Sequence, residues 1–228
     1  MRQLLPVPVD DADPHAVYAD FPHPPGRPAV RLNMISSLDG ATSIDGVSGG
    51  LGGKADGEVF TAVRSVTDVV LVAAGTVRAE HYGPAQTPFA VVTASCALDW
   101  DSPFFTAAIA RPLVVTVEAA PADRRRRAAQ VADLLVAGQT RVDVPAVLAF
   151  FATRGWRRVL AEGGPTLNAQ LAAAGLLDEM CLTVSPYVIG GHAKRVLDAA
   201  ASVTSWTLTS LCEQDGFLFL RYRTVRNA

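Results

Sequence analysis

The sequence predicts an α/β protein with a mixed, mostly parallel central sheet between layers of helices, and an antiparallel hairpin at its end. Two aliphatic runs, 68–74 and 159–161, have the composition of strands buried on both faces, as in parallel sheets covered by helices. Each run leads through a glycine-containing turn into a segment with helical spacing. The alternating segments 203–212 and 217–224 flank a polar turn and predict the hairpin.

Length and composition favour one large domain. Of 228 residues, 50% are hydrophobic and 18% are charged, so the chain can bury a substantial core. We expect residues 1–28 to form an irregular N-terminal arm with one short helix near 13–20, and residues 29–228 to form a single domain. The arm has too many acids and prolines for a secretory signal.

Charge and cysteine usage exclude several classes of partner. The net charge of −2 does not favour nucleic acid, and no long apolar span predicts a membrane helix. Cys96, Cys181 and Cys212 have no CxxC spacing, which is typical of reduced, buried thiols in a cytoplasmic protein. The four histidines are scattered, so we expect no metal site.

The other elements follow from apolar spacing. Val59, Phe60 and Val63 form one stripe on a helix, whereas the four consecutive arginines 124–127 surround another helix and indicate a solvated one. The expected strands are 30–35, 68–74, 89–93, 112–117, 131–136, 159–161 and 179–185, and the expected helices are 55–66, 122–131, 144–154 and 165–174.

Three turns follow strands and should meet at one edge of the sheet. They are 36–40, 75–78 and 162–166, and the carboxyl ends of parallel strands are where such folds bind ligands. A strand that ends in glycines before a helix lets an anion approach the first helical amides. A tight turn with nothing bound gives the same pattern, so both interpretations stay open at this point.

The glycine-rich segment 43–54 resembles a phosphate loop but does not match its pattern. The Walker motif requires glycine where this chain has Ser48, and Ser or Thr where it has Ala55. The segment is therefore expected to be either a mobile loop over a site or an ordinary surface loop.

Several motifs together carry a family resemblance. They are SLDG at 37–40, an arginine at position 64 before the run 68–76, AEGGPTLNAQL at 161–171, and GLLDEMCLTVSPYVIGG at 175–191. In this order they resemble the riboflavin-pathway pyrimidine reductases, the reductase half of the bifunctional deaminase–reductase. The deaminase signature HxE…PCxxC does not occur, so the chain resembles a stand-alone reductase.

The resemblance implies a dihydrofolate-reductase-like, three-layer αβα fold and an NADPH-dependent reaction. A hydride would reach the sugar carbon of a ribosylaminopyrimidine phosphate and give the ribitylamino product. It also implies that 29–228 is the reductase domain and that the protein is a homodimer.

The resemblance further implies which residues bind the cofactor. The double-glycine turn would hold the pyrophosphate, Gly75 and Thr76 would face the nicotinamide half, and the adenosine phosphate would meet hydroxyls past the strand 89–93. Capped helix starts and ordinary surface side chains are the alternative explanations. The implied set is Gly75, Thr76, Glu80, Thr93, Ser95, Gly163, Gly164, Pro165, Thr166, Leu167 and Asn168.

Substrate and catalytic roles are implied for a second set. Glu162 would accept hydrogen bonds from sugar hydroxyls, Arg64 would pair with the substrate phosphate, and Ser48 would add a hydrogen bond. Asp39 would orient the substrate or relay a proton, although a structural Asp-Gly turn is equally expected. Asn33 would face the substrate at a position where many family members have lysine.

Two departures leave alternatives open. The lysine at position 33 is missing, and the turn after Thr76 lacks the family's second phosphate-binding arginine. A reductase of the same fold that acts on a pterin needs fewer basic residues, so it is the second hypothesis. A nucleotide-binding protein without catalysis is the third.

Overall fold

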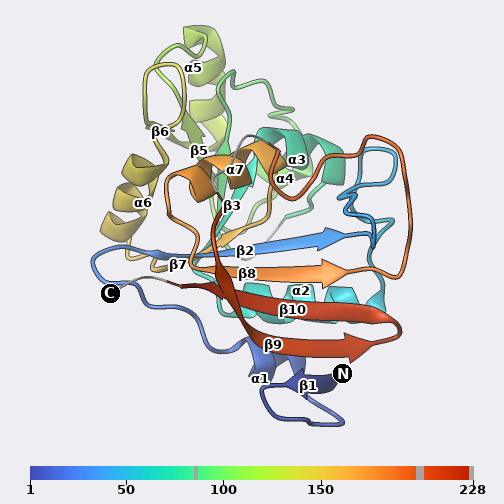
Figure 1. Ribbon diagram of the computed structural model, residues 1–228. Coiled ribbons are helices and arrows are strands. Elements are labelled where there is room, and N and C mark those ends of the chain that lie inside the picture. Colours follow the sequence, from blue (N-terminus) through green and yellow to red (C-terminus); the bar gives the residue numbers. More distant parts are fainter. Residues whose placement is uncertain (85–86, 199–202, 226–228) are drawn as a thin grey trace.

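The computed structural model describes residues 1–84, 87–198 and 203–225 (Figure 1). The strands are β1 (Arg2–Leu5), β2 (Ala29–Ser36), β3 (Val69–Ala73), β4 (Phe89–Val92), β5 (Leu113–Thr116), β6 (Asp133–Val136), β7 (Arg158–Ala161), β8 (Glu179–Val184), β9 (Trp206–Gln214) and β10 (Phe217–Thr224). The helices are α1 (Pro14–Tyr18), α2 (Lys54–Ser65), α3 (Ala74–Glu80), α4 (Pro103–Thr106), α5 (Ala122–Val131), α6 (Val144–Thr153) and α7 (Pro165–Ala173).

All described strands form one sheet in the order β1-β9-β10-β8-β2-β7-β3-β4-β5-β6. From β8 to β6 every neighbouring pair is parallel, and the pairs β10–β8, β10–β9 and β1–β9 are antiparallel. The predicted mixed, mostly parallel sheet and the C-terminal hairpin are therefore confirmed. β8 joins the two parts of the sheet, because it is antiparallel to β10 and parallel to β2.

Helices cover both faces of the sheet, and β3 shows how the sequence directs this. Val70 and Val72 face one core cluster, whereas Val69 and Leu71 face the other. The first cluster contains the buried side chains of α2, and the second contains those of α6 together with Leu167 and Leu171 of α7. A strand buried on both faces needs no alternation of polar residues, which explains its continuous aliphatic sequence.

The N-terminal segment differs from the predicted irregular arm. Arg2–Leu5 forms an edge strand that pairs antiparallel with β9, and α1 occupies part of the predicted helical region. Tyr18 is 1% exposed and belongs to the core. A four-residue edge strand beside prolines has too little pattern to be recognised from sequence. The short helix α4 was also not predicted.

A buried charge cluster attaches this segment to the sheet. Glu179, on β8, forms ion pairs with Arg31 at 2.6 Å, Arg221 at 3.1 Å and Arg223 at 2.8 Å. Burial acts to raise the pKa of Glu179, but the three guanidinium groups outweigh it and the pKa is lowered. Arg31 also donates to the carbonyl oxygen of Tyr18 at 3.1 Å, so the cluster binds the N-terminal backbone.

The three cysteines are unpaired and buried, as predicted. None of the helices in the described ranges has the length and hydropathy that crossing a membrane requires.

Candidate active site

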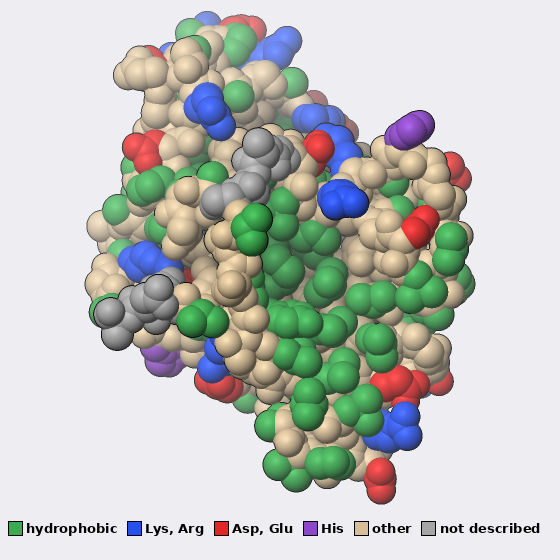
Figure 2. Space-filling view, viewed as in Figure 1, with side chains coloured by type: hydrophobic (Ala, Val, Ile, Leu, Met, Phe, Trp, Pro, Cys, Tyr) green, Lys and Arg blue, Asp and Glu red, His purple; other side chains and the backbone are tan. Residues whose placement is uncertain are grey.

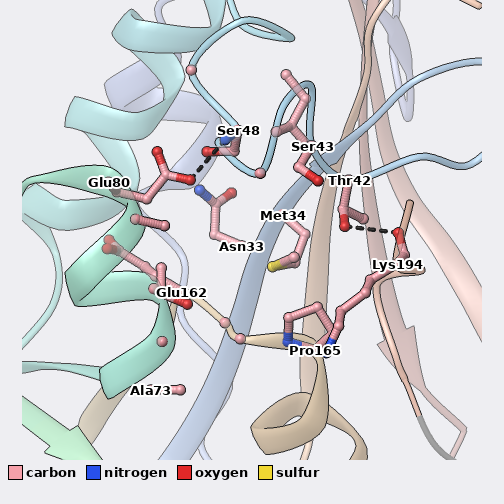
Figure 3. Close-up of a pocket in the computed structure, with 18 of the residues that line it drawn as sticks. Asn33, Met34, Thr42, Ser43, Ser48, Ala73, Glu80, Glu162, Pro165 and Lys194 are labelled. Atoms are coloured by element: carbon pink, nitrogen blue, oxygen red, sulfur yellow. Dashed lines mark hydrogen bonds between the residues drawn. The ribbon is translucent and has the colours of Figure 1, made fainter. Parts of the chain in front are cut away.

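A cavity of about 990 Å³ opens at the carboxyl ends of β2, β3 and β7 (Figure 3). Its walls come from the end of β2, the glycine-rich loop, α3, the start of α7 and the segment 192–194. This volume is at the upper end of the range for small-molecule pockets. The predicted residues that line it are Asn33, Ser48, Gly75, Thr76, Glu80, Glu162, Gly163, Gly164, Pro165, Thr166 and Leu167.

The two glycine corners lie against each other on the same side of the sheet. The N–H of Ala73 donates to the carbonyl oxygen of Gly163 at 2.8 Å. Gly163 has a φ of +89°, a conformation that favours glycine. A Cβ atom at Gly164 would lie 3.3 Å from the Thr76 hydroxyl oxygen, so a larger residue would crowd the corner. The sequence therefore brings two helix starts to one point.

The α7 corner has the properties of an anion site. Gly164 is the N-cap residue and makes no side-chain capping bond, and Pro165 has no N–H to satisfy. The first free amides of the nine-residue helix are thus not capped by a side chain. Thr166 is exposed at this end and Leu167 is buried beneath it. A phosphate at this corner would meet the positive end of the helix dipole.

Glu162 is held by two neighbours instead of being free. Arg64 donates from Nε and Nη2 to the two carboxylate oxygens, each at 2.7 Å, and the Tyr82 hydroxyl donates to Oε2 at 3.1 Å. Burial acts to lower the pKa of Arg64, but the bonds to Glu162 outweigh it and raise the pKa. Burial also raises the pKa of Tyr82, which therefore stays a hydrogen-bond donor.

This geometry pairs Arg64 with Glu162, and the expected pairing of Arg64 with a substrate phosphate stays a prediction. The guanidinium fork is engaged by Glu162, and Arg64 does not line the cavity. It also lies over the rings of Phe60 and Phe89, with its Cζ 4.1 Å and 5.2 Å from their centroids. Arg64 therefore orients Glu162, and direct pairing with a substrate phosphate would require breaking a bidentate ion pair. The sequence could not identify this partner because 98 residues separate the two.

Asp39 clamps two loops, which agrees with the structural Asp-Gly turn expected as its alternative role, and a role toward substrate stays a prediction. Its carboxylate accepts hydrogen bonds from the Ser37 hydroxyl and from the backbone N–H groups of Ile189 and Gly190. These donors lower the pKa of Asp39 to about 2. The side chain does not line the cavity, so it joins two loops of the SLDG and SPYVIGG motifs.

Asn168 makes a structural contact, and its expected contact with cofactor stays a prediction. Its side chain is fully buried and donates from Nδ2 to the carbonyl oxygen of Val196 at 2.9 Å. It therefore fixes α7 to the segment that follows β8 and does not line the cavity.

Thr93 and Ser95 lie outside the cavity. The Thr93 hydroxyl accepts a hydrogen bond from the N–H of Cys96 at 3.0 Å, and its expected contact with cofactor stays a prediction. Ser95 is exposed, and its carbonyl oxygen accepts from Arg124 at 3.4 Å.

The glycine-rich loop covers the site and is attached to α3. The N–H of Ser48 donates to Oε1 of Glu80 at 2.7 Å, which Figure 3 shows as a dashed line. Glu80 thus lines the cavity and holds the loop at the same time. The sequence left two interpretations of this loop, a loop over a site or an ordinary surface loop. Its position over the cavity agrees with the first.

Several cavity residues were not identified from the sequence. They are Thr42, Ser43, Asp56, Phe60, Tyr82, His192 and Lys194. Asp56 was interpreted only as a favourable acid in a first helical turn. Lys194 follows the SPYVIGG motif in an irregular segment, where no periodicity gives a signal.

Charge is distributed unevenly around the cavity. In Figure 3, Glu80 and Glu162 lie on one side of β2, and Lys194 and Pro165 lie on the other. Lys194 forms an ion pair with Asp198 at 2.9 Å, while its backbone carbonyl accepts from the Thr42 hydroxyl at 2.8 Å. The cation is therefore near the uncapped helix start, where phosphate would be favoured.

Comparisons with known proteins agree with this architecture. The RibD C-terminal domain family matches residues 28–217. A 2,5-diamino-6-ribosylamino-4(3H)-pyrimidinone 5′-phosphate reductase of Methanothermobacter thermautotrophicus is 31% identical over 182 residues, which are 75% of this chain and 83% of that protein. The protein of the same name from Archaeoglobus fulgidus is 31% identical over 188 residues, 73% of this chain and 84% of that one.

Solved structures share the fold. A pyrimidine reductase-like protein of Corynebacterium diphtheriae has a TM-score of 0.80 at 24% identity, covering 88% of this chain and 93% of that one. Dihydrofolate reductase from Enterococcus faecalis has a TM-score of 0.54 at 10% identity, covering 87% and 97%. The chain belongs to the RibD C-terminal domain family, the riboflavin-pathway pyrimidine reductases, and has their dihydrofolate-reductase-like fold.

Proposed function

We propose that this protein uses NADPH to reduce a ribosylaminopyrimidine 5′-phosphate to its ribitylamino form. The supporting observation is that two glycine corners meet beside one large cavity in a chain of the pyrimidine reductase family. The relatives from M. thermautotrophicus and A. fulgidus are named as reductases of such a phosphate.

The residues of the corners fit a dinucleotide. The amides after Gly164 suit the pyrophosphate, and Gly75 and Thr76 approach the same point from α3. Bound NADPH would supply the hydride. Recognition of its adenosine phosphate would fall to the segment after β4, where Arg124 and Arg78 donate to the carbonyl oxygens of Ser95 and Ala97.

The substrate would occupy the other part of the cavity, under the glycine-rich loop. Glu162, held by Arg64 and Tyr82, presents a carboxylate of fixed orientation to sugar hydroxyls. Asn33 and Ser48 line the same space, whereas Lys194 lies on the other side of β2 beside Pro165.

The test is oxidation of NADPH, followed by absorbance, with a panel of substrates. We expect turnover with a ribosylaminopyrimidine phosphate and none with dihydropterins. Turnover of dihydropterins alone would instead indicate a pterin reductase. That enzyme is the second candidate because few basic residues in the described ranges line the cavity. Tight NADPH binding without turnover would indicate a nucleotide-binding protein.

We also propose that the protein is a cytoplasmic homodimer. The alternate residues of β8 and β10 that face away from α2 are partly exposed and apolar, and they include Met180, Leu182, Leu218 and Leu220. Figure 2 shows hydrophobic side chains gathered over these strands. A second copy would cover this face. Light scattering should give a molar mass of twice the chain mass. The variant Leu220→Arg should have the mass of a single chain, whereas Val203→Arg, at a fully exposed position, should remain a dimer.

A further inference from the structure

Asp56 is a cavity residue whose charge has no cationic partner. It lies in the first turn of α2 and lines the cavity with Phe60 of the same helix. Within the described part of the chain, no Lys, Arg or His nitrogen is within 4.0 Å of its carboxylate. An ionised carboxylate in such surroundings is stabilised by a ligand that donates hydrogen bonds.

The surroundings of Asp56 shield its carboxylate in part from water. A Cβ atom at Gly52 would lie 2.9 Å from Oδ2, so the glycine-rich loop closes onto the carboxylate. Burial raises the pKa of Asp56, and the neighbouring Thr183 hydroxyl, which favours the charged form, opposes that rise. Thr183 is 4% exposed and is the register partner of Ile35, another cavity residue. The site thus combines acceptor oxygens, a hydroxyl and apolar walls.

This combination suits the edge of one kind of flat heterocycle. A 2-amino-4-oxopyrimidine presents two adjacent donors, the 2-amino group and N3–H, whose spacing matches the two oxygens of a carboxylate. A uracil has an oxygen at position 2, so it offers one donor between two acceptors. A carboxylate facing uracil would accept one hydrogen bond and repel the neighbouring oxygen.

We propose that Asp56 determines which base the enzyme accepts, because its two oxygens accept hydrogen bonds from the 2-amino group and N3–H of a 2-amino-4-oxopyrimidine substrate. This inference rests on the proposed reductase function and assigns recognition of the base to one side chain; the relatives from M. thermautotrophicus and A. fulgidus are named for such a 2-amino compound. The enzyme would then act on the pyrimidine that still carries its 2-amino group, and a separate hydrolytic deamination would have to follow the reduction.

The first experiment compares kcat/KM for two ribosylaminopyrimidine phosphates that differ only in a 2-amino or 2-oxo group. We expect the unaltered enzyme to prefer the 2-amino compound by about 100-fold, since the other leaves a buried acceptor facing an oxygen. In Asp56→Asn the amide offers one acceptor and one donor, which match N3–H and the 2-oxo group. The preference should therefore fall at least tenfold or reverse.

Glu58→Gln is the matched control, because it removes the same charge from the same helix at an exposed position paired with Lys54. We expect it to leave the ratio of the two kcat/KM values unchanged. Equal use of both compounds by the unaltered enzyme would overturn the inference and leave the reductase function standing. An unchanged ratio in a folded Asp56→Asn variant would do the same.

A binding measurement separates this inference from the proposed function. Calorimetry would compare 2,6-diaminopyrimidin-4(3H)-one with 6-aminouracil, two small bases that need no turnover. We expect only the first to bind in the presence of NADPH. If neither phosphate is reduced, the proposed function fails, and equal binding of the two bases would independently overturn the role of Asp56. This comparison can still overturn the inference if the Asp56→Asn variant does not fold.

Discussion

Glu162 and Arg64 form a buried pair in which each residue determines what the other can do. The Arg64 side chain is 23% exposed and that of Glu162 is 3% exposed, so removing one partner leaves a charge in a poorly solvated place. We expect Arg64→Met to lower the free energy of unfolding by about 3 kcal/mol, measured by urea denaturation. Arg64→Met combined with Glu162→Gln should lose less than the sum of the single changes. A loss below about 1 kcal/mol in the single variant would contradict a strong pair.

Gly164 is the position where an added side chain would act most directly on the cofactor. Gly164→Asp would place its Cβ atom 3.3 Å from the Thr76 oxygen and a negative charge at the proposed pyrophosphate site. We expect the Kd for NADPH to rise by about 30-fold or more, measured by calorimetry. Gly83→Asp, at a glycine with open space around its Cβ position, serves as the control. Equal affinity in the two variants would exclude this corner as the phosphate site.

The candidate site could be predicted in part, and the individual residues show why. Gly163, Gly164 and Thr76 were identified because glycine turns and helix starts leave local signals. The engagement of Arg64 by Glu162 and the clamp at Asp39 depend on partners far along the chain. A sequence pattern shows which side chain is present, but it does not show whether another residue already binds it.

At the scale of elements, Asp39 joins the turn after β2 to the segment after β8. Its pKa of about 2 in the folded protein is below the ordinary value of about 3.9, so its contacts stabilise the fold above pH 4. That contribution is lost as the pH falls from about 4 to 2. We expect Asp39→Asn to have a lower Tm than the unaltered protein at pH 7, and the difference to shrink below pH 4. Asp10→Asn, in an exposed turn, should show no such trend.

The elements that could be predicted were those with long or strongly periodic patterns. The buried strand β3 and the helix α5 were predicted within about one residue of their bounds. β1 and α4 have four residues each, which is too short for a period to be recognised. Their structure depends on tertiary contacts, such as the pairing of β1 with β9.

At the scale of the whole molecule, the N-terminal segment is part of the fold although the family match begins at residue 28. Arg31 and Arg221 donate to the carbonyl oxygens of Tyr18 and Asp20, and both guanidinium groups are buried. Removal of residues 1–20 would take away these carbonyl acceptors and leave the two buried guanidinium groups with Glu179 as their shared partner. We expect the truncated chain to lose its cooperative thermal transition in circular dichroism, whereas removal of residues 1–5 should only lower the Tm. A truncated chain as stable as the full one would contradict this attachment.

The position of Asp56 on α2 has a consequence for how this scaffold can diversify. The carboxylate is carried by a helix that packs on one face of the sheet, while the double-glycine corner starts a helix on the other. A change of acid to amide alters one atom and leaves the dinucleotide corner intact. A single nucleotide substitution in one codon could therefore exchange the order of two steps in a biosynthetic route without loss of the reducing chemistry.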